Sequence, residues 1–353
     1  MNWSEDLVYW YQKNKRSLPW RDVSNPYYTW LSEVILQQTR VAQAIPYFYR
    51  FIEKYPTIHD LSQASESNIL MLWQGLGYYS RGRNLHKAAQ IWVEQYGGNF
   101  NLSIKELQSL PGIGSYTAAA IASIAFEHPV PVIDGNVYRV VSRLLCITEP
   151  VPSKKAEQLF YEVLLDAMQG LKPSEFNQGL MELGALVCKP QNPQCNTCPL
   201  KLHCRAYSEN KVTQFPVKIK KAAVKPLYLH YLFCTEPAQD KTLIYRRSEG
   251  IWKGLYEFPV LQTQGPSLSE VDLCKHLGLD LEEDVLHIEP DWRADHKLTH
   301  RLIHAFFWKI EVKNLGLLKN KSIFEIQLEE LMSFPTHQLM KKYLNTLLPT
   351  AHD

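Results

Sequence analysis

One glutamate of this sequence lies where general acid chemistry is possible. Glu33 stands in a segment whose other members are mostly apolar, namely Trp30, Leu31, Val34, Ile35 and Leu36. A carboxyl group in so apolar a setting is expected to have a raised pKa, so that it can donate a proton near neutral pH. The alternative is a glutamate on the exposed face of a helix. Gln37, Gln38 and Thr39 follow and supply hydrogen-bonding groups near the same surface.

A second candidate site is the turn Leu110-Pro-Gly-Ile-Gly114, which precedes a stretch of small residues at about 116–125. Gly112 and Gly114 leave backbone N–H groups uncovered where a helix begins, and a helix N-terminus favours negative charge. We therefore expect a phosphate site that needs no net positive charge. A turn that merely joins two helices is the alternative. An acid, Asp134, follows in the next turn, Asp134-Gly135-Asn136.

Four of the seven cysteines lie close together in the sequence: Cys188, Cys195, Cys198 and Cys204. Four thiolates on a short loop after a helix can enclose a tetrahedral site, for zinc or for an iron–sulfur cluster, and the spacing leaves both open. An odd total with four members clustered does not fit a secreted disulfide framework. The three remaining cysteines are expected to be packing residues.

The segment Gln74-Gly-Leu-Gly-Tyr-Tyr-Ser-Arg81 separates two expected helices. Its glycines flank Leu76 and Tyr78, and such a loop can push an apolar or aromatic wedge outward, as proteins do when they unstack a base. A buried turn with core aromatics is the alternative.

Composition places few limits on function. The chain has 353 residues, 45% of them hydrophobic, and a net charge of +2, so bulk charge does not argue for nucleic acid. The strongest basic cluster fits a solvated linker as well as a DNA contact: Lys211, Lys218, Lys220, Lys221 and Lys225. The N-terminus lacks the apolar core of a signal peptide and no apolar run is long enough to span a membrane, so we expect a cytoplasmic protein with no membrane partner.

Hydrophobic periodicity predicts two domains. Little strand signal precedes residue 215, and the first domain, 1–207, is predicted to be all-α. Its helices are expected at 1–18, at 28 to about 44, and at 69–73, 83–96, 136–145, 153–168 and 174–187. A polar linker at 208–226 leads to an α+β domain at 227–353. That domain is expected to have strands at 227–235, 242–246 and 302–312 and a helix near 269–277.

Taken together, these segments resemble the MutY family of adenine DNA glycosylases, in the helix-hairpin-helix and endonuclease III superfamily. The resemblance covers nearly the whole chain. Besides the turn at 110–114, the matching pieces are Leu18-Pro-Trp-Arg21, Trp30-Leu-Ser-Glu-Val-Ile-Leu-Gln-Gln-Thr39, Gly75-Leu-Gly-Tyr-Tyr-Ser-Arg81, Ile133-Asp-Gly-Asn136 and Glu182-Leu-Gly-Ala-Leu-Val-Cys188. It implies an all-α helix-hairpin-helix glycosylase domain with a [4Fe-4S] cluster loop, followed by a smaller α+β Nudix-like, MutT-related domain.

The resemblance also implies an activity: excision of adenine mispaired with 8-oxoguanine or guanine in double-stranded DNA. Glu33 matches the general acid that protonates adenine N7, and Asp134 matches the carboxylate that stabilises the oxocarbenium ion. Tyr116 and Asn136 match residues that orient these acids. Further matches near the base pocket or the disrupted base step are Arg21, Gln38, Thr39, Gln178, Leu76 and Tyr78. The four clustered cysteines match the ligands of the cluster.

Two parts of the sequence bear on the type of reaction and on recognition of the opposite base. Endonuclease III-like relatives that also cut the backbone carry a Schiff-base lysine where this chain has Tyr116, and a phenol cannot form an imine. We therefore expect a monofunctional glycosylase rather than a bifunctional pyrimidine glycosylase/lyase. The presence of both Glu33 and Asp134 argues against a catalytically silent damage sensor. In the loop expected to read 8-oxoguanine, many members have Phe-Ser-His where this chain has Leu298, Thr299 and His300.

The C-terminal half matches the family at Gly250-Ile-Trp-Lys-Gly-Leu-Tyr-Glu-Phe-Pro259, yet it contains no Glu-rich Nudix catalytic motif. It is therefore expected to read a base and not to hydrolyse nucleotides. A monomer acting on the nucleoid of a bacterium is the expected form of the protein.

Overall fold

The computed structural model describes residues 2–21, 25–219, 224–237, 239–298, 301–318 and 322–347. The chain forms two compact units. The first contains residues up to 63 together with 84–219, and the second contains residues 64–83 together with those from 224 onward. The C-terminal unit thus includes a segment from the N-terminal half of the sequence.

The first unit is helical, as expected. Its helices are α1 (Trp3–Asn14), α2 (Pro26–Leu36), α3 (Val41–Lys54), α4 (Ile58–Gln63), α6 (Ser80–Tyr96, which starts in the second unit), α7 (Ile104–Ser109), α8 (Ser115–Phe126), α9 (Gly135–Leu145), α10 (Lys154–Ala167), α11 (Pro173–Leu186) and α12 (Arg205–Ser208). Short 3-10 turns, η1 (Cys195–Thr197), η2 (Lys201–His203) and η3 (Val212–Gln214), follow α11 and α12. Among the described residues, no helix combines the length and the apolar character that a membrane span requires.

The single helix expected from Tyr28 to about Ala44 is wrong, because two helices occupy this stretch. Helix α2 ends at Leu36, and the Thr39 N–H closes the turn onto the Leu36 carbonyl at 3.0 Å. Between the helices Gln38 has a φ of 60°, a left-handed conformation that is uncommon for residues other than glycine. This break contains no glycine or proline, so the hydrophobic periodicity predicted one continuous helix across it.

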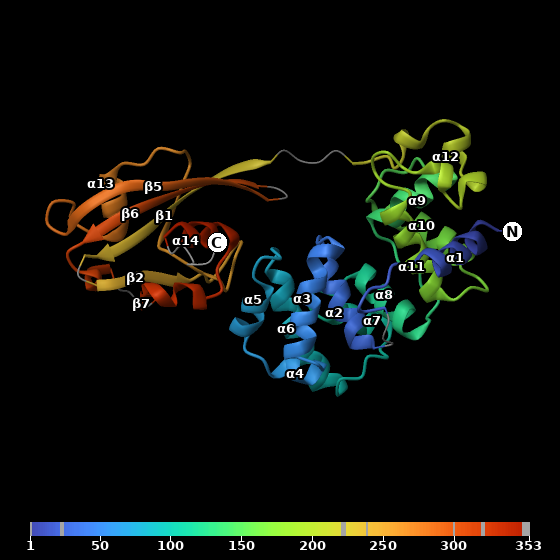
Figure 1. The fold of residues 1–353 in the computed structure, drawn as a ribbon, viewed down its shortest axis with the longest axis horizontal. Helices are drawn as coiled ribbons and strands as arrows, with labels where there is room; N and C mark the ends of the chain where they lie inside the picture. Colours follow the sequence, from blue (N-terminus) through green and yellow to red (C-terminus); the bar gives the residue numbers. More distant parts are fainter. Residues whose placement is uncertain are drawn as a thin grey trace. The chain divides into compact units, whose positions relative to one another are not determined.

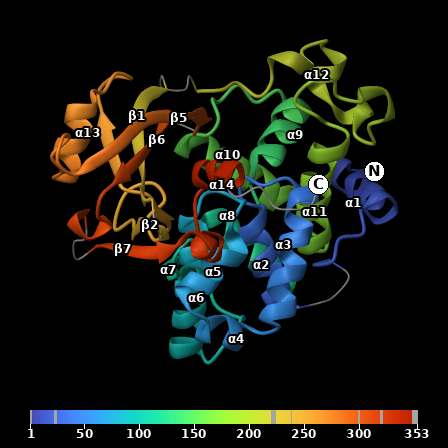
Figure 2. The same cartoon turned by 60° about the vertical axis from the view of Figure 1, so that its left-hand side comes forward.

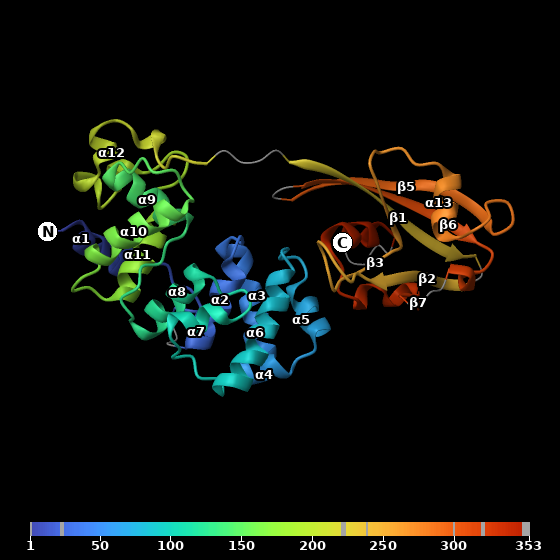
Figure 3. The ribbon, with the colours of Figure 1, turned by 180° about the vertical axis from the view of Figure 1, so that it is seen from behind.

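The helices of the first unit form two groups, which Figures 1 and 3 show. One group contains α1, α9, α10 and α11 around a shared apolar core, and the other contains α2, α3, α6, α7 and α8. Helices α8 and α11 contact each other where the groups meet. The small residues of α8, such as Ala119 and Ala120, are buried in this region and permit the close approach.

The second unit is built on a mixed seven-stranded sheet. Its strands are β1 (Lys225–Glu236), β2 (Gln239–Arg246), β3 (Tyr256–Glu257), β4 (Val260–Thr263), β5 (Val285–Lys297), β6 (Arg301–Val312) and β7 (Ile323–Gln327). The main order is β3-β2-β1-β6-β5, with β4 paired to β1 and β7 to β2. Only the β1–β6 pair is parallel among the described ladders. This confirms the expected α+β class, although the sequence pattern missed β3, β4, β5 and β7.

Helices cover both faces of this sheet, as Figure 2 shows. Helix α13 (Glu270–Leu277) packs through Leu273 and Cys274 on the face that carries Leu232 and Ile310. Helix α14 (Gln338–Leu347) packs on the other face, where Tyr343 stacks on Phe307 at 4.2 Å between ring centroids. Helix α5 (Glu66–Trp73) also belongs to this unit, together with the 3-10 turns η4 (Leu315–Leu318) and η5 (Leu328–Ser333).

One glycine sets the contact between α9 and α11. A Cβ added at Gly184 would lie 2.5 Å from the Cβ and 3.1 Å from the Cα of Asn136. No side chain fits in that space without moving one helix. Gly179, on the same helix, is less crowded, since an added Cβ would lie 3.3 Å from atoms of Leu7 and Tyr11.

We predict that Gly184→Ala lowers the free energy of unfolding by about 1–3 kcal/mol, because an overpacked contact forces the backbones apart. Urea denaturation would measure this loss. Gly179→Ala is the matched control on the same helix and should lose less. Equal effects of the two substitutions would contradict the assigned role of the Gly184 contact.

Candidate active site

Residues of the two helix groups meet around one cavity of about 200 Å³. Glu33 comes from α2, Tyr116 from the first turn of α8, and Asp134 and Asn136 from the start of α9. The cavity also brings in three other residues that the sequence singled out, Arg21, Thr39 and Gln178. Seven of the predicted site residues therefore meet at one cavity.

Glu33 is buried, with 7% of its surface exposed, so the alternative of an exposed helix glutamate is wrong. Its helix turns Trp30, Leu31 and Ile35 into the core, and this fixes the direction of the carboxyl group. Burial raises the pKa of Glu33 to about 7, against the lowering effect of a hydrogen bond from Tyr116. A carboxyl group with this pKa can both donate and accept a proton near neutral pH.

Tyr116 holds the Glu33 carboxyl group directly. Its hydroxyl donates to Glu33 Oε2 at 2.6 Å. Burial, with Glu33 and Asp134 nearby, raises the pKa of the phenol well above its ordinary value. The phenol therefore stays neutral and acts as a hydrogen-bond donor.

Asp134 caps helix α9. Its Oδ1 accepts from the Val137 N–H at 2.7 Å, and its Oδ2 accepts from the Asn136 amide at 2.7 Å. Burial raises the pKa of Asp134, while these two hydrogen bonds lower it. The net effect is a pKa above the ordinary value, because the two donors and the helix N-terminus oppose the effect of burial only in part. The site thus places an oriented carboxyl group on the cavity wall.

Arg139 is a supporting residue that the sequence did not reveal. Its Nη2 donates to Asn136 Oδ1 and to the Gly184 carbonyl, each at 2.7 Å. Its Nε donates to the carbonyl of Cys188, also at 2.7 Å. One guanidinium thus links the Asn136–Asp134 pair to the first cysteine of the cluster.

Glu182 was also missed as a site residue. It is 1% exposed and accepts from Arg16 Nε at 2.7 Å and from Arg21 Nη2 at 3.1 Å. Burial alone would raise the pKa of Glu182, but the bonds from Arg16 and Arg21 hold it at about 2. The hydrogen bond from Arg21 to Glu182 fixes Arg21 at the cavity. In the sequence, the only indication of this role was an acid inside the apolar run of α11, because its arginine partners lie more than a hundred residues away.

The remaining predicted residues lie outside this cavity. Gln38 is exposed in its left-handed turn, and Gly112, with a φ of 78°, and Gly114 are exposed at the turn before α8. Leu76 is 6% exposed whereas Tyr78 is 51% exposed, so the loop buries one candidate wedge and presents the other. In the second unit Leu298 is partly buried at the end of β5. Thr299 and His300 lie outside the described residues.

The turn before α8 has the form predicted for it. Helix α8 begins at Ser115 with Gly114 as its N-cap, and the Ile113 N–H donates to the Leu110 carbonyl at 3.2 Å. A Cβ at Gly112 would lie 2.8 Å from Asn84 Cβ, and its positive φ also requires glycine.

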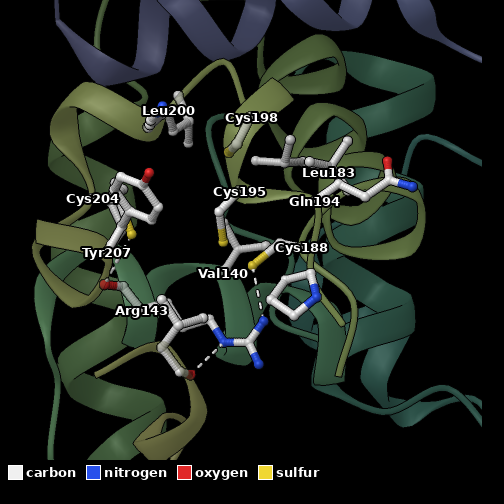
Figure 4. Close-up of a pocket in the computed structure, with 15 residues that line it drawn as sticks. Val140, Arg143, Leu183, Cys188, Gln194, Cys195, Cys198, Leu200, Cys204 and Tyr207 are labelled. Atoms are coloured by element: carbon white, nitrogen blue, oxygen red, sulfur yellow. Dashed lines mark hydrogen bonds between the residues drawn. The ribbon is translucent and has the colours of Figure 1, made fainter. Parts of the chain in front are cut away.

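The four clustered cysteines line a second cavity, and Figure 4 shows their thiols facing it. Cys188 follows α11, Cys195 begins η1, Cys198 follows η1, and Cys204 precedes α12. Buried Arg143 donates to Cys188 Sγ at 3.3 Å and to the Lys189 carbonyl at 2.8 Å.

The donor set of this cavity is all thiol. Burial raises the pKa of Cys198 to about 11, so four ionised thiolates would need a cationic centre between them. Within the part of the chain that the structure describes, no three His, Cys, Asp or Glu side chains are arranged to hold a metal ion.

Comparison with known proteins identifies both units. Residues 31–164 match the model of the HhH-GPD superfamily of base excision DNA repair proteins, and residues 231–346 match the NUDIX domain. The adenine DNA glycosylase of Buchnera aphidicola subsp. Baizongia pistaciae is 35% identical over 306 residues, which cover 84% of this chain and 87% of that protein.

The chain belongs to the adenine DNA glycosylase family. It is therefore a DNA glycosylase, an enzyme of base excision repair that hydrolyses an N-glycosidic bond. The MutY-type resemblance drawn from the sequence motifs is confirmed.

Solved structures support the fold of the helical unit of this glycosylase. A thermostable thymine-DNA glycosylase matches with a TM-score of 0.52 and 26% identity, covering 58% of this chain and 95% of that chain. A non-covalent endonuclease III–DNA complex matches with a TM-score of 0.51 and 25% identity, covering 59% and 94%. DNA binding by this fold is thus seen directly in a neighbour.

The raised pKa of Glu33 predicts a pH-dependent cost to the glycosylase's stability. The native state keeps a proton on Glu33 up to about pH 7, whereas the unfolded state releases it near 4.5. The native state therefore binds more protons in this window, and its stability falls as the pH rises through it. Glu33→Gln removes this loss. The difference in free energy of unfolding, variant minus wild type, should therefore increase by about 3 kcal/mol between pH 4.5 and pH 7.

Urea denaturation at several pH values would measure the difference. Glu94→Gln is the control, because Glu94 is exposed on α6. A pH-independent difference for Glu33→Gln would contradict the buried, protonated glutamate.

Proposed function

We propose that this glycosylase excises adenine mispaired with 8-oxoguanine or guanine in double-stranded DNA, as a monofunctional enzyme and a monomer. The observation that carries the proposal is a buried carboxyl group with a pKa of about 7 and an oriented second carboxylate on the wall of one cavity. Two carboxyl groups whose environments give them different protonation states are what acid-assisted glycosidic cleavage requires.

In the proposed mechanism Glu33 donates its proton to N7 of an adenine that has left the base stack. The protonated adenine departs with the electron pair of the N-glycosidic bond, and positive charge develops on the deoxyribose. Asp134 stabilises that charge at C1′, by charge alone or by a transient bond. Ionised Glu33 then takes a proton from water, whose oxygen adds to C1′, so that Glu33 is restored.

Two neighbours keep these acids in place. Tyr116 donates to Glu33, and Asn136 donates to Asp134. The hydroxyl of Tyr116 cannot form an imine with C1′, which supports base removal without strand cleavage. Arg21 and Gln178 lie on the cavity wall, where their polar groups can contact the extruded base.

DNA contacts are proposed for several residues outside the cavity and for Thr39 on its wall. The exposed amides at Gly112 and Gly114 suit a backbone phosphate, because they lie at a helix N-terminus. Gln38 and Thr39 offer hydrogen bonds to a base edge, and exposed Tyr78 with Leu76 serves at the disrupted base step. For the opposite base, the proposed reading loop contains Leu298, Thr299 and His300, within a recognition domain at 227–353 that follows the catalytic domain at 1–207 and the linker at 208–226.

We assign a [4Fe-4S] cluster to Cys188, Cys195, Cys198 and Cys204. The support is an all-thiol donor set around one cavity, with the Arg143 guanidinium against Cys188. When bound, the cluster would supply the positive centre that keeps four partly buried thiols ionised. Through the Cys188 carbonyl, Arg139 then ties this loop to Asn136 and Asp134.

Single-turnover cleavage of duplexes tests the function. Each duplex would contain one adenine opposite 8-oxoguanine, guanine or thymine, and products would be read with and without alkali. We expect strand breaks only after alkali, and only for adenine opposite 8-oxoguanine or guanine. Breaks without alkali would show a lyase, and tight binding with no breaks would show a damage sensor. Glu33→Gln and Asp134→Asn should each slow excision at least a hundredfold, the usual scale for losing an acid–base or charge-stabilising group.

The cluster assignment predicts a loss of bound iron. Cys198→Ser should lower the iron content per protein and weaken DNA binding, because the ordered loop after α11 loses a ligand. Iron analysis and a binding titration would measure both effects. Cys146→Ser is the matched control, since Cys146 ends α9 and does not line the cavity. Unchanged iron and affinity in Cys198→Ser would refute the assignment.

A further inference from the structure

The loop that exposes Tyr78 is attached to the C-terminal unit on both sides of that residue. Before it, the Gln74 amide donates to the Thr336 hydroxyl at 2.9 Å. After it, the Tyr79 hydroxyl donates to the Thr336 carbonyl at 3.2 Å. Thr336 is 4% exposed and Tyr79 is 5% exposed, so the hydrogen bond between them is buried, while the one from Gln74 is partly buried. One residue of the C-terminal unit therefore holds the two ends of the loop.

The helices flanking the loop are held by the same unit. Arg246 pairs with Glu66 of α5 at 2.6 Å. A Cβ at Gly254, which has a φ of 83°, would lie 3.3 Å from Glu66 Oε1 and 3.4 Å from Leu70 Cδ1. The Arg83 guanidinium donates to the Lys253 carbonyl. The turn at 250–254 thus receives α5 and the first residues of α6.

Thr336 is itself fixed in the core of the unit. Next to it, the Tyr256 N–H donates to the Pro335 carbonyl at 2.9 Å. His337 is fully buried, contacts Glu257 at 3.1 Å, and stacks on Trp252 with 3.8 Å between ring centroids. The anchor is therefore a rigid point and not a surface loop.

The loop needs such an anchor because its backbone is strained. Tyr78 has a φ of 48°, and the glycines before it have φ values of 99° at Gly75 and 71° at Gly77. A left-handed aromatic residue is uncommon and persists only where its surroundings hold it. Trp73 Nε1 adds a hydrogen bond to the Gly77 carbonyl at 3.1 Å. Strain and attachment together present the Tyr78 ring to solvent.

From these contacts we infer that Thr336 is a positioning residue for Tyr78. It ties the loop at 74–81, which is proposed to separate the bases, to the unit that contains the proposed base-reading loop after β5. That loop joins β5 to β6, and its Leu298 N–H donates to the Arg301 carbonyl at 2.8 Å. The two loops belong to one compact unit. This inference rests on the proposed role of Tyr78 in separating bases.

Base-step opening can be measured apart from excision. The probe is a duplex with adenine opposite 8-oxoguanine and 2-aminopurine as the neighbouring base, which brightens when it loses its stacking partner. The full-length, cluster-loaded enzyme would be mixed rapidly with this duplex. We expect Tyr79→Phe and Thr336→Val each to slow brightening about three- to tenfold, the scale for losing one buried hydrogen bond. Affinity for a fully paired duplex should stay unchanged, and Thr336→Ser should restore the wild-type rate.

Tyr27→Phe is the matched control. The Tyr27 hydroxyl also donates to a buried carbonyl, that of Tyr55, at 2.9 Å, but it lies in the helical unit. Its loss should lower thermal stability as Tyr79→Phe does, and should leave brightening at the wild-type rate. Equal slowing by Tyr27→Phe and Tyr79→Phe would reduce the effect to general stability and overturn the inference.

Two further outcomes separate this inference from the proposed function. If Tyr78→Ala abolishes brightening while Tyr79→Phe and Thr336→Val brighten normally, the anchor is refuted and the wedge stands. If Tyr78→Ala brightens normally, both the wedge and the anchor are refuted. Slowed brightening in Tyr79→Phe and Thr336→Val supports the inference. If the wild type opens the base step but releases no adenine, the proposed excision is refuted and the inference about Thr336 is not affected.

Discussion

The feature on which this site depends is the burial of the Glu33 carboxyl group where α2 packs against α8, with one hydrogen bond from Tyr116. A carboxyl group removed from water keeps its proton unless charge or hydrogen bonds compensate it. Here the hydrogen bond from Tyr116 and the charge of Arg21 compensate it only in part, which leaves its pKa at about 7. The packing of α2 against α8 provides that balance, so the core of the helical unit and the acidity of Glu33 have one origin.

Three acids of the same region show how differently burial can be compensated. Glu182 is even less exposed than Glu33, yet two arginines hold its pKa at about 2. Asp134 receives hydrogen bonds from the start of α9, and burial nevertheless raises its pKa above the ordinary value. The protein thus keeps a charged Glu182–arginine pair that fixes Arg21, an oriented carboxyl group at Asp134, and a protonatable acid at Glu33 around one cavity. A proton donor beside an ion stabiliser requires this separation of environments.

The second unit achieves its order by different means. Its sheet carries helices on both faces, and a buried cluster of Glu257, His337 and Tyr231 lies between β1, β3 and the start of α14. The hydrogen bond and charge of His337, together with the charge of the paired Arg247, keep the pKa of Glu257 below the ordinary value despite its burial. Around that rigid centre the unit receives residues 64–83, which bring α5 and the Tyr78 loop to it.

Several features of this protein follow from residues that are close together in the sequence. The apolar neighbours of Glu33, the glycine turn before α8, the cysteine spacing and the all-α and α+β halves could all be predicted, because periodicity and turn chemistry act over a few residues. The proposed metal centre and the proposed residue roles were inferred from the family resemblance. Three features became visible only in the folded chain: the left-handed break at Gln38, the pairing of Glu182 with Arg16 across 166 positions, and the attachment of residues 64–83 to the C-terminal unit. These features arise from contacts between residues far apart in the chain, and no local pattern encodes which distant partner a buried charge or a strained loop will find.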